Sequence, residues 1–250
     1  MNHLLLAGAS GRLGREILTA GQNKNYAIHC VNRSELGELN TRIEKISANP
    51  NEQIIIIDVT LPEGTETILK SLQCIHNTAQ IKGMVIGSTG HSDQQLQKIS
   101  EISKILPIIL STNFSRGVYL FEEILKAKTS SGVSVSSLAR QLGFDLSLWE
   151  SHHIKKKDAP SGTARTLATA ASVDLDRVVS TRVGAIVGEH SLLMSQESEE
   201  LRITHIAHSR RLFAEGALDL CERLFKQTLE NKVYNMSDAL NDLLQSKGKD

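Results

Sequence analysis

Short apolar runs alternate with amphipathic segments through the first half of the chain. The runs carry apolar side chains on both faces, which is typical of strands in a covered parallel sheet. The predicted strands are Leu4–Ala7, Ala27–Val31, Gln53–Ile57, Gly83–Ile86 and Ile108–Leu110. Apolar residues at helical spacing predict helices over Arg12–Gly21, from Pro62 onward, and over Asp93–Leu106. This alternation predicts an α/β fold with a right-handed, doubly wound parallel sheet.

The pattern changes after Asn113. A helix is predicted over Gly117–Lys128, a Ser/Gly-rich loop over Thr129–Ser137, a strand over Phe144–Trp149 and a helix from Ser161. Three further segments are predicted to form strands of an antiparallel sheet: Val183–Val187, Ser191–Ser195 and Leu201–Ala207. Phe213–Leu229 is predicted to return to helix. We therefore expect a second α+β domain over residues 116–210, inserted into a first domain formed by residues 1–115 and 211–250.

Composition narrows the classes of protein. Lys+Arg and Asp+Glu each number 28 among 250 residues, so the formal net charge is zero and the basic excess of a nucleic-acid binder is absent. No apolar run approaches the ~20 residues of a membrane helix, and Leu4–Ala7 is too short for a signal peptide. Cys30, Cys74 and Cys221 form neither a disulfide framework nor a metal pattern, so we expect small core residues in a reducing cytoplasm.

A glycine-rich segment joins the first predicted strand to the first predicted helix. Glycines in such a turn allow a close approach of the backbone to a ligand, and the helix N-terminus offers free N–H groups to a pyrophosphate. The spacing is GxxGxxG rather than GxGxxG, but its position in the first strand–helix turn indicates a dinucleotide site. The residues concerned are Gly8, Ser10, Gly11, Arg12, Leu13 and Gly14. The loops Asp58–Gly64, Gly87–His91 and Ser111–Ser115 are expected at the same edge of the sheet.

The end of the second predicted strand indicates which dinucleotide is preferred. An acidic residue for the ribose 2′-hydroxyl is expected ~20 residues after the glycine loop, but the chain has Asn32 and Arg33 there. A guanidinium pairs well with a 2′-phosphate, so we predict a preference for NADPH over NADH. The alternative is that Arg33 is merely solvated and that Glu35 binds the ribose.

The most informative stretch is Glu150–Ala164. Ser161 is a predicted N-cap, and the N–H groups of Gly162 and Thr163, with the Thr163 hydroxyl, are placed to hold a carboxylate at a helix N-terminus. Two histidines and three lysines directly upstream add cationic donors. The stretch therefore suits a small dianion, and a His or Lys beside it can supply a proton during reduction.

Taken singly, the parts of this stretch have simpler interpretations. A His-His pair is more often a surface pair or a metal candidate than a catalytic group, but no Cys or third His lies at ligand spacing, so no metal is expected. A run of three lysines is usually a solvated face. The combination is what carries the functional interpretation.

The string from His152 to Ala164 (His-His-x-x-Lys-x-Asp-Ala-Pro-Ser-Gly-Thr-Ala) resembles the signature of the dihydrodipicolinate reductase family. Family-like stretches occur in the same order from Leu5 to Gly216, and they are Gly8–Gly14, Asp58–Gly64, Gly87–Gly90, Asn113–Val118, Gly188–His190 and Ile203–His205. Two departures are a long Thr129–Gly143 segment and a short segment before Val187.

The resemblance implies a fold, a reaction and site residues. It implies a Rossmann-type dinucleotide domain, a substrate and tetramerisation domain, and hydride transfer from NADPH or NADH to a cyclic imine dicarboxylate in lysine and diaminopimelate biosynthesis. His152 and Lys156 match the family's catalytic pair, one of which donates the proton. His153, Ser161, Gly162 and Thr163 match its carboxylate-binding groups. The nicotinamide-side contacts match Gly87, Ser88, Thr89, Thr112, Asn113 and Phe114.

Two other functions stay open at this point. One is a different nicotinamide-dependent dehydrogenase, such as an amino-acid dehydrogenase, which the basic segment disfavours. The other is a degenerate homologue that senses NADPH without turnover, which the presence of His152, Lys156 and Thr163 disfavours because a sensor needs no proton donor.

Overall fold

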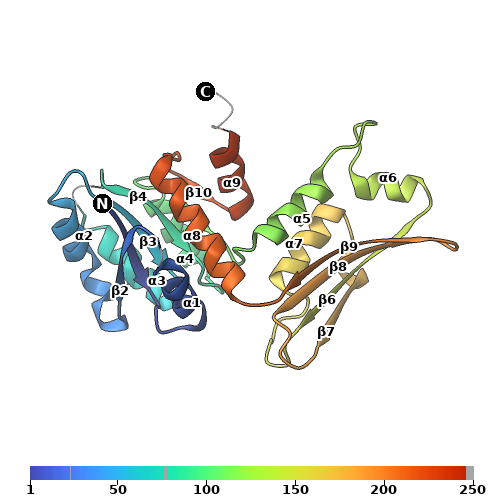
Figure 1. Ribbon diagram of the computed structural model, residues 1–250, viewed down its shortest axis with the longest axis horizontal. Coiled ribbons are helices and arrows are strands. Elements are labelled where there is room, and N and C mark those ends of the chain that lie inside the picture. The colour runs from blue at the N-terminus through green and yellow to red at the C-terminus, as the bar shows by residue number, and fades with distance from the viewer. Residues whose placement is uncertain (23, 76–77, 246–250) are drawn as a thin grey trace. The chain divides into compact units, whose positions relative to one another are not determined.

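The protein is described by a computed structural model that covers residues 1–22, 24–75 and 78–245. The chain folds into two compact units (Figure 1). Unit 1 contains Met1–Phe114 and the C-terminal segment from Phe213, and unit 2 is the intervening Ser115–Leu212.

Unit 1 is built on a six-stranded, wholly parallel sheet with the strand order β10-β5-β4-β3-β1-β2. Its strands are β1 (Asn2–Ala7), β2 (Tyr26–Val31), β3 (Gln53–Asp58), β4 (Ile81–Ile86), β5 (Ile108–Leu110) and β10 (Val233–Tyr234). The five strands that the apolar runs predict are confirmed. Helices cover both faces, which explains why the Gln-Ile-Ile-Ile-Ile run of β3 is apolar throughout.

The two faces of this sheet are covered by different helices. Helices α2 (Leu39–Ser47), α3 (Pro62–Leu72) and α4 (Asp93–Ile102) pack with Leu5, Ile54 and Ile56 in one apolar core. On the other face lie α1 (Arg12–Gly21) and α8 (Arg211–Lys226), where Gly21 meets Ile28 and Leu218. The predicted helix starts at Arg12, Pro62 and Asp93 are confirmed, whereas the predicted helix Asp93–Leu106 already ends at Ile102.

Four elements of unit 1 are absent from the predicted pattern. They are a 3-10 helix over Arg33–Glu38, helix α2 after it, strand β10, and helix α9 (Met236–Gln245) after β10. The 3-10 helix begins in a capping box in which the Asn32 and Glu35 side chains each bond the other's backbone N–H. Leu36, Leu39, Ile43 and Ile46 recur at helical spacing through the 3-10 helix and α2 and pack into the core, so the sequence carried an apolar stripe that the prediction overlooked.

Unit 2 pairs a four-stranded sheet with three helices. The strand order is β7-β6-β8-β9, with β6 (Asp145–His152), β7 (Val178–Arg182), β8 (Gly188–Ser195) and β9 (Glu200–Ala207). Helices α5 (Arg116–Lys126) and α7 (Gly162–Ala171) pack on one face, with α6 (Val135–Gln141) beside them. Leu146, Leu148 and Leu192 face these helices in the second apolar core.

Two expectations for unit 2 are wrong. The predicted strand Val183–Val187 is a turn around Gly184, whose φ is +50°, and the strand at this point is β7, which ends at Arg182. Because β7 pairs in parallel with β6, the sheet is mixed rather than antiparallel. The predicted loop Thr129–Ser137 is confirmed as far as Ser134, which caps α6, and only its last three residues belong to that helix. Helix α6 accounts for the length of Thr129–Gly143.

One cysteine also departs from expectation. Cys221 is buried and Cys30 half-buried, but Cys74 is exposed just after α3. Among the residues that the structure describes, every helix is too short or too polar to cross a bilayer.

Candidate active site

The glycine loop of unit 1 is held in a form that only glycine permits. Gly8 has a φ of +87°, and a Cβ there would lie 2.7 Å from the Val59 carbonyl oxygen. A Cβ on Gly14 would lie 2.1 Å from the Gly8 carbonyl oxygen, which accepts the Gly11 N–H at 2.9 Å. Helix α1 then starts at Arg12 with no side chain capping it. Its first N–H groups therefore lie at a turn shaped for close approach of a phosphate.

A cavity of about 330 Å³ opens beside this loop. Gly8, Ser10 and Gly11 line it from the loop, and Asn32 and Arg33 line it from the end of β2. Arg12, Leu13 and Gly14 belong to α1 and lie outside the lining. The cavity therefore joins the predicted pyrophosphate residues to the predicted ribose residues.

Glu35 is engaged away from this cavity. One carboxylate oxygen accepts the Asn32 backbone N–H at 2.8 Å, and the other pairs with the Arg42 guanidinium. Arg42 also donates to the Cys30 carbonyl at 3.1 Å. The exposed Arg33 side chain is thus the charged group that β2 offers to the cavity.

The predicted nicotinamide-side residues follow two neighbouring strands. Gly87–Thr89 follow β4 and Thr112–Phe114 follow β5, and Ile86 and Leu110 at the strand ends are in register. A Cβ on Gly87 would meet the Phe114 ring at 2.6 Å, so the two segments touch.

Side chains in these two segments differ in exposure. Thr89 and Thr112 are exposed, and Asn113 is half-buried. Ser88 is buried, and its hydroxyl bonds Thr65 at 2.7 Å and Asp58 at 3.4 Å. The Ser88 side chain therefore links the end of β4 to the end of β3 and to α3. The Thr89 and Thr112 side chains remain accessible to a ligand.

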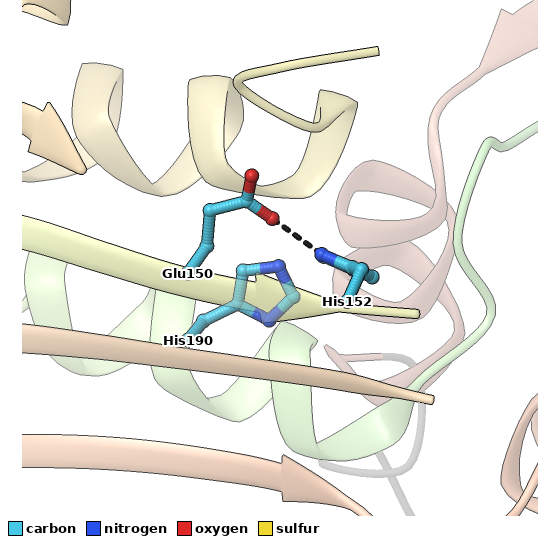
Figure 2. A group of neighbouring side chains, drawn as sticks. All are labelled: Glu150, His152 and His190. Carbon is cyan, nitrogen blue, oxygen red and sulfur yellow. Dashed lines mark ion pairs between the residues drawn. The ribbon is translucent and has the colours of Figure 1, made fainter. Parts of the chain in front are cut away.

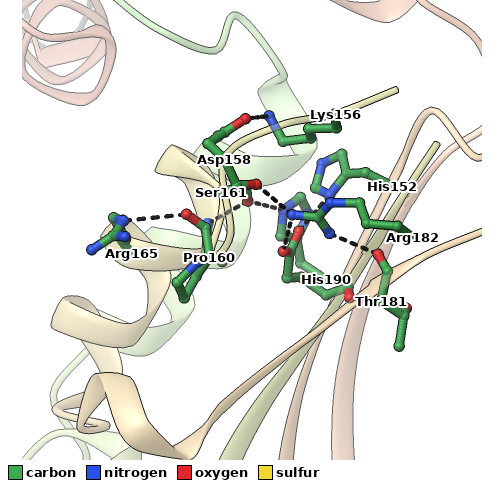
Figure 3. A network of polar contacts seen from close by, with 11 residues as sticks. His152, Lys156, Asp158, Pro160, Ser161, Arg165, Thr181, Arg182 and His190 are labelled. Atoms are coloured by element: carbon green, nitrogen blue, oxygen red, sulfur yellow. Dashed lines mark hydrogen bonds and ion pairs between the residues drawn. The ribbon is translucent and has the colours of Figure 1, made fainter. Parts of the chain in front are cut away.

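The basic stretch of unit 2 places His152 in a buried ion-pair network (Figures 2 and 3). Glu150 and His152 are two residues apart on β6 and share the face that packs under the helices. His152 Nδ1 pairs with one carboxylate oxygen of Glu150, and the Arg182 guanidinium lies 2.9 Å from the other. The Glu150 carboxylate is 0% exposed. This cluster offers metal-binding ligand types, but both oxygens of Glu150 already have partners, one of them a cation, so we interpret it as an ion-pair network.

Two further histidines extend the network across the sheet. His190 on β8 lies opposite Glu150 and His205 on β9 lies opposite His190. The His152 and His190 rings meet edge to face with centroids 5.2 Å apart. His190 Nε2 lies 3.4 Å from the Ser161 hydroxyl at the start of α7, and His205 Nε2 lies 3.1 Å from the Ser115 hydroxyl at the start of α5. Through His190 and His205, the sheet is thus connected to the N-termini of α7 and α5.

Burial and charge set the protonation of this network. Burial lowers the pKa of His152, and it lowers the pKa of His190 to about 3 with help from the neighbouring charges of His152 and His205. Burial would raise the pKa of Glu150, but Ser180, Arg182 and His152 outweigh it and lower the pKa. Near neutral pH, Glu150 is therefore ionised and His190 is neutral.

A turn after β6 brings Lys156 back toward His152. The Lys156 N–H bonds the His153 carbonyl at 3.0 Å, and the half-buried Lys156 ammonium pairs with Asp158 at 3.0 Å. Lys155 and Lys157 are exposed, whereas His153 and Thr163 are half-buried. The predicted cap is confirmed at Ser161, whose hydroxyl accepts the Ala164 N–H at 3.2 Å. The candidate proton donors and the candidate anion-binding turn therefore belong to one cluster in unit 2.

Sequence reasoning missed three members of this cluster, namely Glu150, Arg182 and His190. Strand periodicity offered a signal for Glu150, because it shares the inner face of β6 with His152. His190 ends the family-like stretch Gly188–His190, but no local pattern places it or Arg182 beside Glu150, since both reach the cluster only through strand pairing.

Comparison with known proteins gives a consistent family. The model described as "Dihydrodipicolinate reductase, N-terminus" matches residues 2–114, and "Dihydrodipicolinate reductase, C-terminus" matches residues 117–240. A 4-hydroxy-tetrahydrodipicolinate reductase of Wolinella succinogenes is 33% identical, covering 96% of this chain and 99% of its own length. One of Buchnera aphidicola is 30% identical, covering 96% and 97%.

Solved structures show the same fold. A dipicolinate-bound dihydrodipicolinate reductase from Paenisporosarcina sp. TG-14 matches with a TM-score of 0.60 at 20% identity, covering 94% of this chain and 97% of its own. A DAP dehydrogenase from C. glutamicum in complex with DAP matches with a TM-score of 0.50 at 9% identity, covering 97% and 95%.

Proposed function

Because the chain belongs to the dihydrodipicolinate reductase family, we propose that it reduces 4-hydroxy-tetrahydrodipicolinate to tetrahydrodipicolinate with a nicotinamide cofactor, in lysine and diaminopimelate biosynthesis. The observation that carries the proposal is the cluster in unit 2, where His152 and Lys156 lie beside the capped start of α7. A dicarboxylate substrate needs an anion site and an acid close together, and this cluster supplies both.

The residues of unit 2 divide the work as follows. His153 and the Ser161–Thr163 turn bind a substrate carboxylate, since the start of α7 offers N–H groups and positive dipole. Hydride addition to a conjugated imine leaves electron density that must be protonated, and His152 or Lys156 donates that proton. Asp158 holds the Lys156 ammonium at 3.0 Å and so limits where it can point.

The residues of unit 1 fit a dinucleotide, which supplies the hydride when bound. A Cβ at Gly8 or Gly14 would collide with the backbone of Val59 or Gly8, so the two glycines permit the tight turn whose N–H groups suit a pyrophosphate. The preference for NADPH over NADH is supported by Arg33, which lines the cavity, and by Glu35, whose oxygens are engaged by Asn32 and Arg42. The pyrophosphate contacts then fall to Gly8–Gly14, and the nicotinamide side falls to Gly87–Thr89 and Thr112–Phe114.

The proposal includes a homotetramer in the cytoplasm. Support comes from the outer face of the unit 2 sheet, which the described helices of that unit leave uncovered. Trp149, Val179 and Leu193 line a hollow on this face together with Glu189 and Arg202. An apolar, partly charged sheet face of this kind suits a second copy of the chain.

A coupled assay tests the proposal. Purified protein is mixed with aspartate semialdehyde, pyruvate, a dihydrodipicolinate synthase and NADPH, and loss of NADPH absorbance is followed. We expect oxidation that requires the coupled substrate and that falls at least about 100-fold in His152→Ala and Lys156→Ala, as for loss of a general acid. The matched control is Lys157→Ala, an exposed neighbour.

Either of two outcomes would reject the proposal. NADPH binding without turnover in wild-type protein would favour a sensor, and turnover with amino acids instead would favour a different dehydrogenase. An equal loss of activity in Lys157→Ala would show that the run of lysines acts only through its total charge.

A further inference from the structure

Glu150 lies at the centre of the unit 2 cluster, although the proposed reaction assigns it no role. We propose that Glu150 is a positioning residue that holds His152 by Nδ1, so that Nε2 is the ring atom that exchanges protons. Its carboxylate is fully buried two residues before His152, on the same face of β6.

Hydrogen-bond roles decide the tautomer. An ionised carboxylate can only accept, and a neutral imidazole carries a single N–H. Because Nδ1 lies in ion-pair contact with the buried Glu150 carboxylate, the negative charge favours the tautomer of the neutral ring that carries its proton on Nδ1. Nε2 is then a lone pair in the neutral ring and an N–H in the protonated ring, which is the arrangement a proton donor requires.

Glycine keeps the Nε2 side of the ring open. A Cβ on Gly188, at the start of β8, would lie 3.1 Å from His152 Nε2. Because Gly188 has no side chain, β8 passes the His152 ring without covering Nε2. The opposite side of the ring is fixed by Glu150, and the two contacts together orient Nε2.

Arg182 allows a carboxylate to remain charged at this depth. Its guanidinium lies 2.9 Å from Glu150 and also donates to the Thr181 carbonyl at 2.7 Å and to the Asp158 carbonyl. An isolated buried carboxylate would take up a proton and lose its hold on Nδ1–H. The neighbouring strand β7 therefore supplies the anchor for the positioning residue.

The charged and titratable groups around His152 come from four segments. They are Glu150 on the same strand, Arg182 on β7, His190 on β8 and Lys156 in the turn after β6. Burial lowers the pKa of His152, Lys156 and Arg182 lower it further, and Glu150 raises it. Glu150 is therefore the residue that sustains a protonated population of His152.

The direct test is a histidine titration by NMR on the whole protein without ligand. In Glu150→Gln we expect the pKa of His152 to fall by about one unit, a tenfold change in acid dissociation constant, because an opposite charge has been removed. We also expect the neutral ring to populate both tautomers. Asp145→Asn is the matched control, since Asp145 lies on β6 and pairs with Arg177 on the exposed surface.

The pKa and the tautomer of His152 in Glu150→Gln decide the outcome of the NMR titration. An unchanged His152 pKa and a single tautomer in folded Glu150→Gln protein would overturn the proposal. If that variant does not fold, the double variant Glu150→Gln with Arg182→Gln removes both buried charges and is titrated in the same way.

The kinetic arm rests on the proposed function. In Glu150→Gln we expect kcat to fall about 10- to 100-fold, as is typical when the partner of a functional histidine is lost, with KM for the substrate little changed. The falling limb of the pH profile should move to lower pH. In a His152→Ala background, Glu150→Gln should produce no further loss.

The two arms separate the possible failures. If wild-type protein does not turn over the coupled substrate, the reductase proposal fails, while the NMR titration still decides the role of Glu150. If both substitutions reduce kcat independently, Glu150 does not act through His152 and the positioning proposal fails.

Discussion

Arg33 is the residue on which the choice of cofactor depends. It is the charged side chain that the end of β2 presents to the cavity beside the glycine loop, because Glu35 is bound by Asn32 and Arg42. In Arg33→Ala we expect KM for NADPH to rise about tenfold or more, consistent with ~1.5 kcal/mol for a hydrogen bond to a charged group. KM for NADH should change little. The control is Arg15→Ala, an exposed arginine on α1 outside the cavity, and a clear NADH preference in wild-type protein would contradict the prediction.

His190 makes stability depend on pH. Its pKa falls from an ordinary 6.5 to about 3 in the folded protein, so between these values the unfolded chain binds a proton that the folded chain does not. The free energy of unfolding should therefore decrease as pH falls through this window, by at most ~1.4 kcal/mol per pH unit for one histidine. His152 and His205, whose pKa values burial also lowers, act in the same direction.

Denaturant unfolding between pH 7 and pH 5 measures this dependence. The slope should be shallower in His190→Gln than in wild-type protein. Leu142→Gln, at an exposed residue that does not titrate, should leave the slope unchanged. Identical slopes in wild type and His190→Gln would contradict the prediction.

A serine N-cap stabilises a helix start, and at α7 it is also proposed to form part of the carboxylate site. Ser134 and Ser161 each cap a helix of unit 2, and each hydroxyl accepts the N–H three residues ahead at 3.2 Å. Replacing either serine with alanine should cost ~1 kcal/mol of stability, the usual effect of losing an N-cap.

Only the start of α7 is proposed to bind a carboxylate. Ser161→Ala should therefore weaken binding of dipicolinate several-fold, whereas Ser134→Ala should leave it unchanged. Calorimetric titration with dipicolinate, the ligand of the Paenisporosarcina relative, measures both variants. Equal losses of affinity would show that stability, and not the anion site, is responsible.

The outer face of the unit 2 sheet is the surface through which the proposed homotetramer would assemble. Val179 is 52% exposed there and contributes to the hollow that Trp149 and Leu193 also line. In Val179→Arg we expect the proposed homotetramer to dissociate, because a buried unpaired charge is costly at an apolar interface. Light scattering after size-exclusion chromatography measures the mass. Leu142→Arg, at an exposed residue after α6, should leave it unchanged, and an unaltered mass for Val179→Arg would contradict the prediction.

Local patterns by themselves determined much of unit 1. Strands such as Leu4–Ala7 and Gln53–Ile57 are short apolar runs, and helix starts such as Pro62 have local signals, so both could be predicted without knowing the fold. The glycine loop could also be predicted from the sequence, because the φ of +87° that the turn needs at Gly8 favours glycine. The basic stretch and the Ser161 cap could be predicted as well, because the residues that form them are adjacent in the chain.

Only the tertiary structure decided which strands pair and which buried charges meet. The strand expected at Val183–Val187 is a turn, because Gly184 takes a left-handed conformation with a φ of +50° and the parallel pairing of β7 with β6 ends at Arg182. Arg182 and His190 reach Glu150 and His152 across strand pairs, and the ladder that joins them depends on register, which no single segment contains. The sequence therefore determined the proposed donors and the anion-binding turn, whereas long-range pairing decided the charges that orient them.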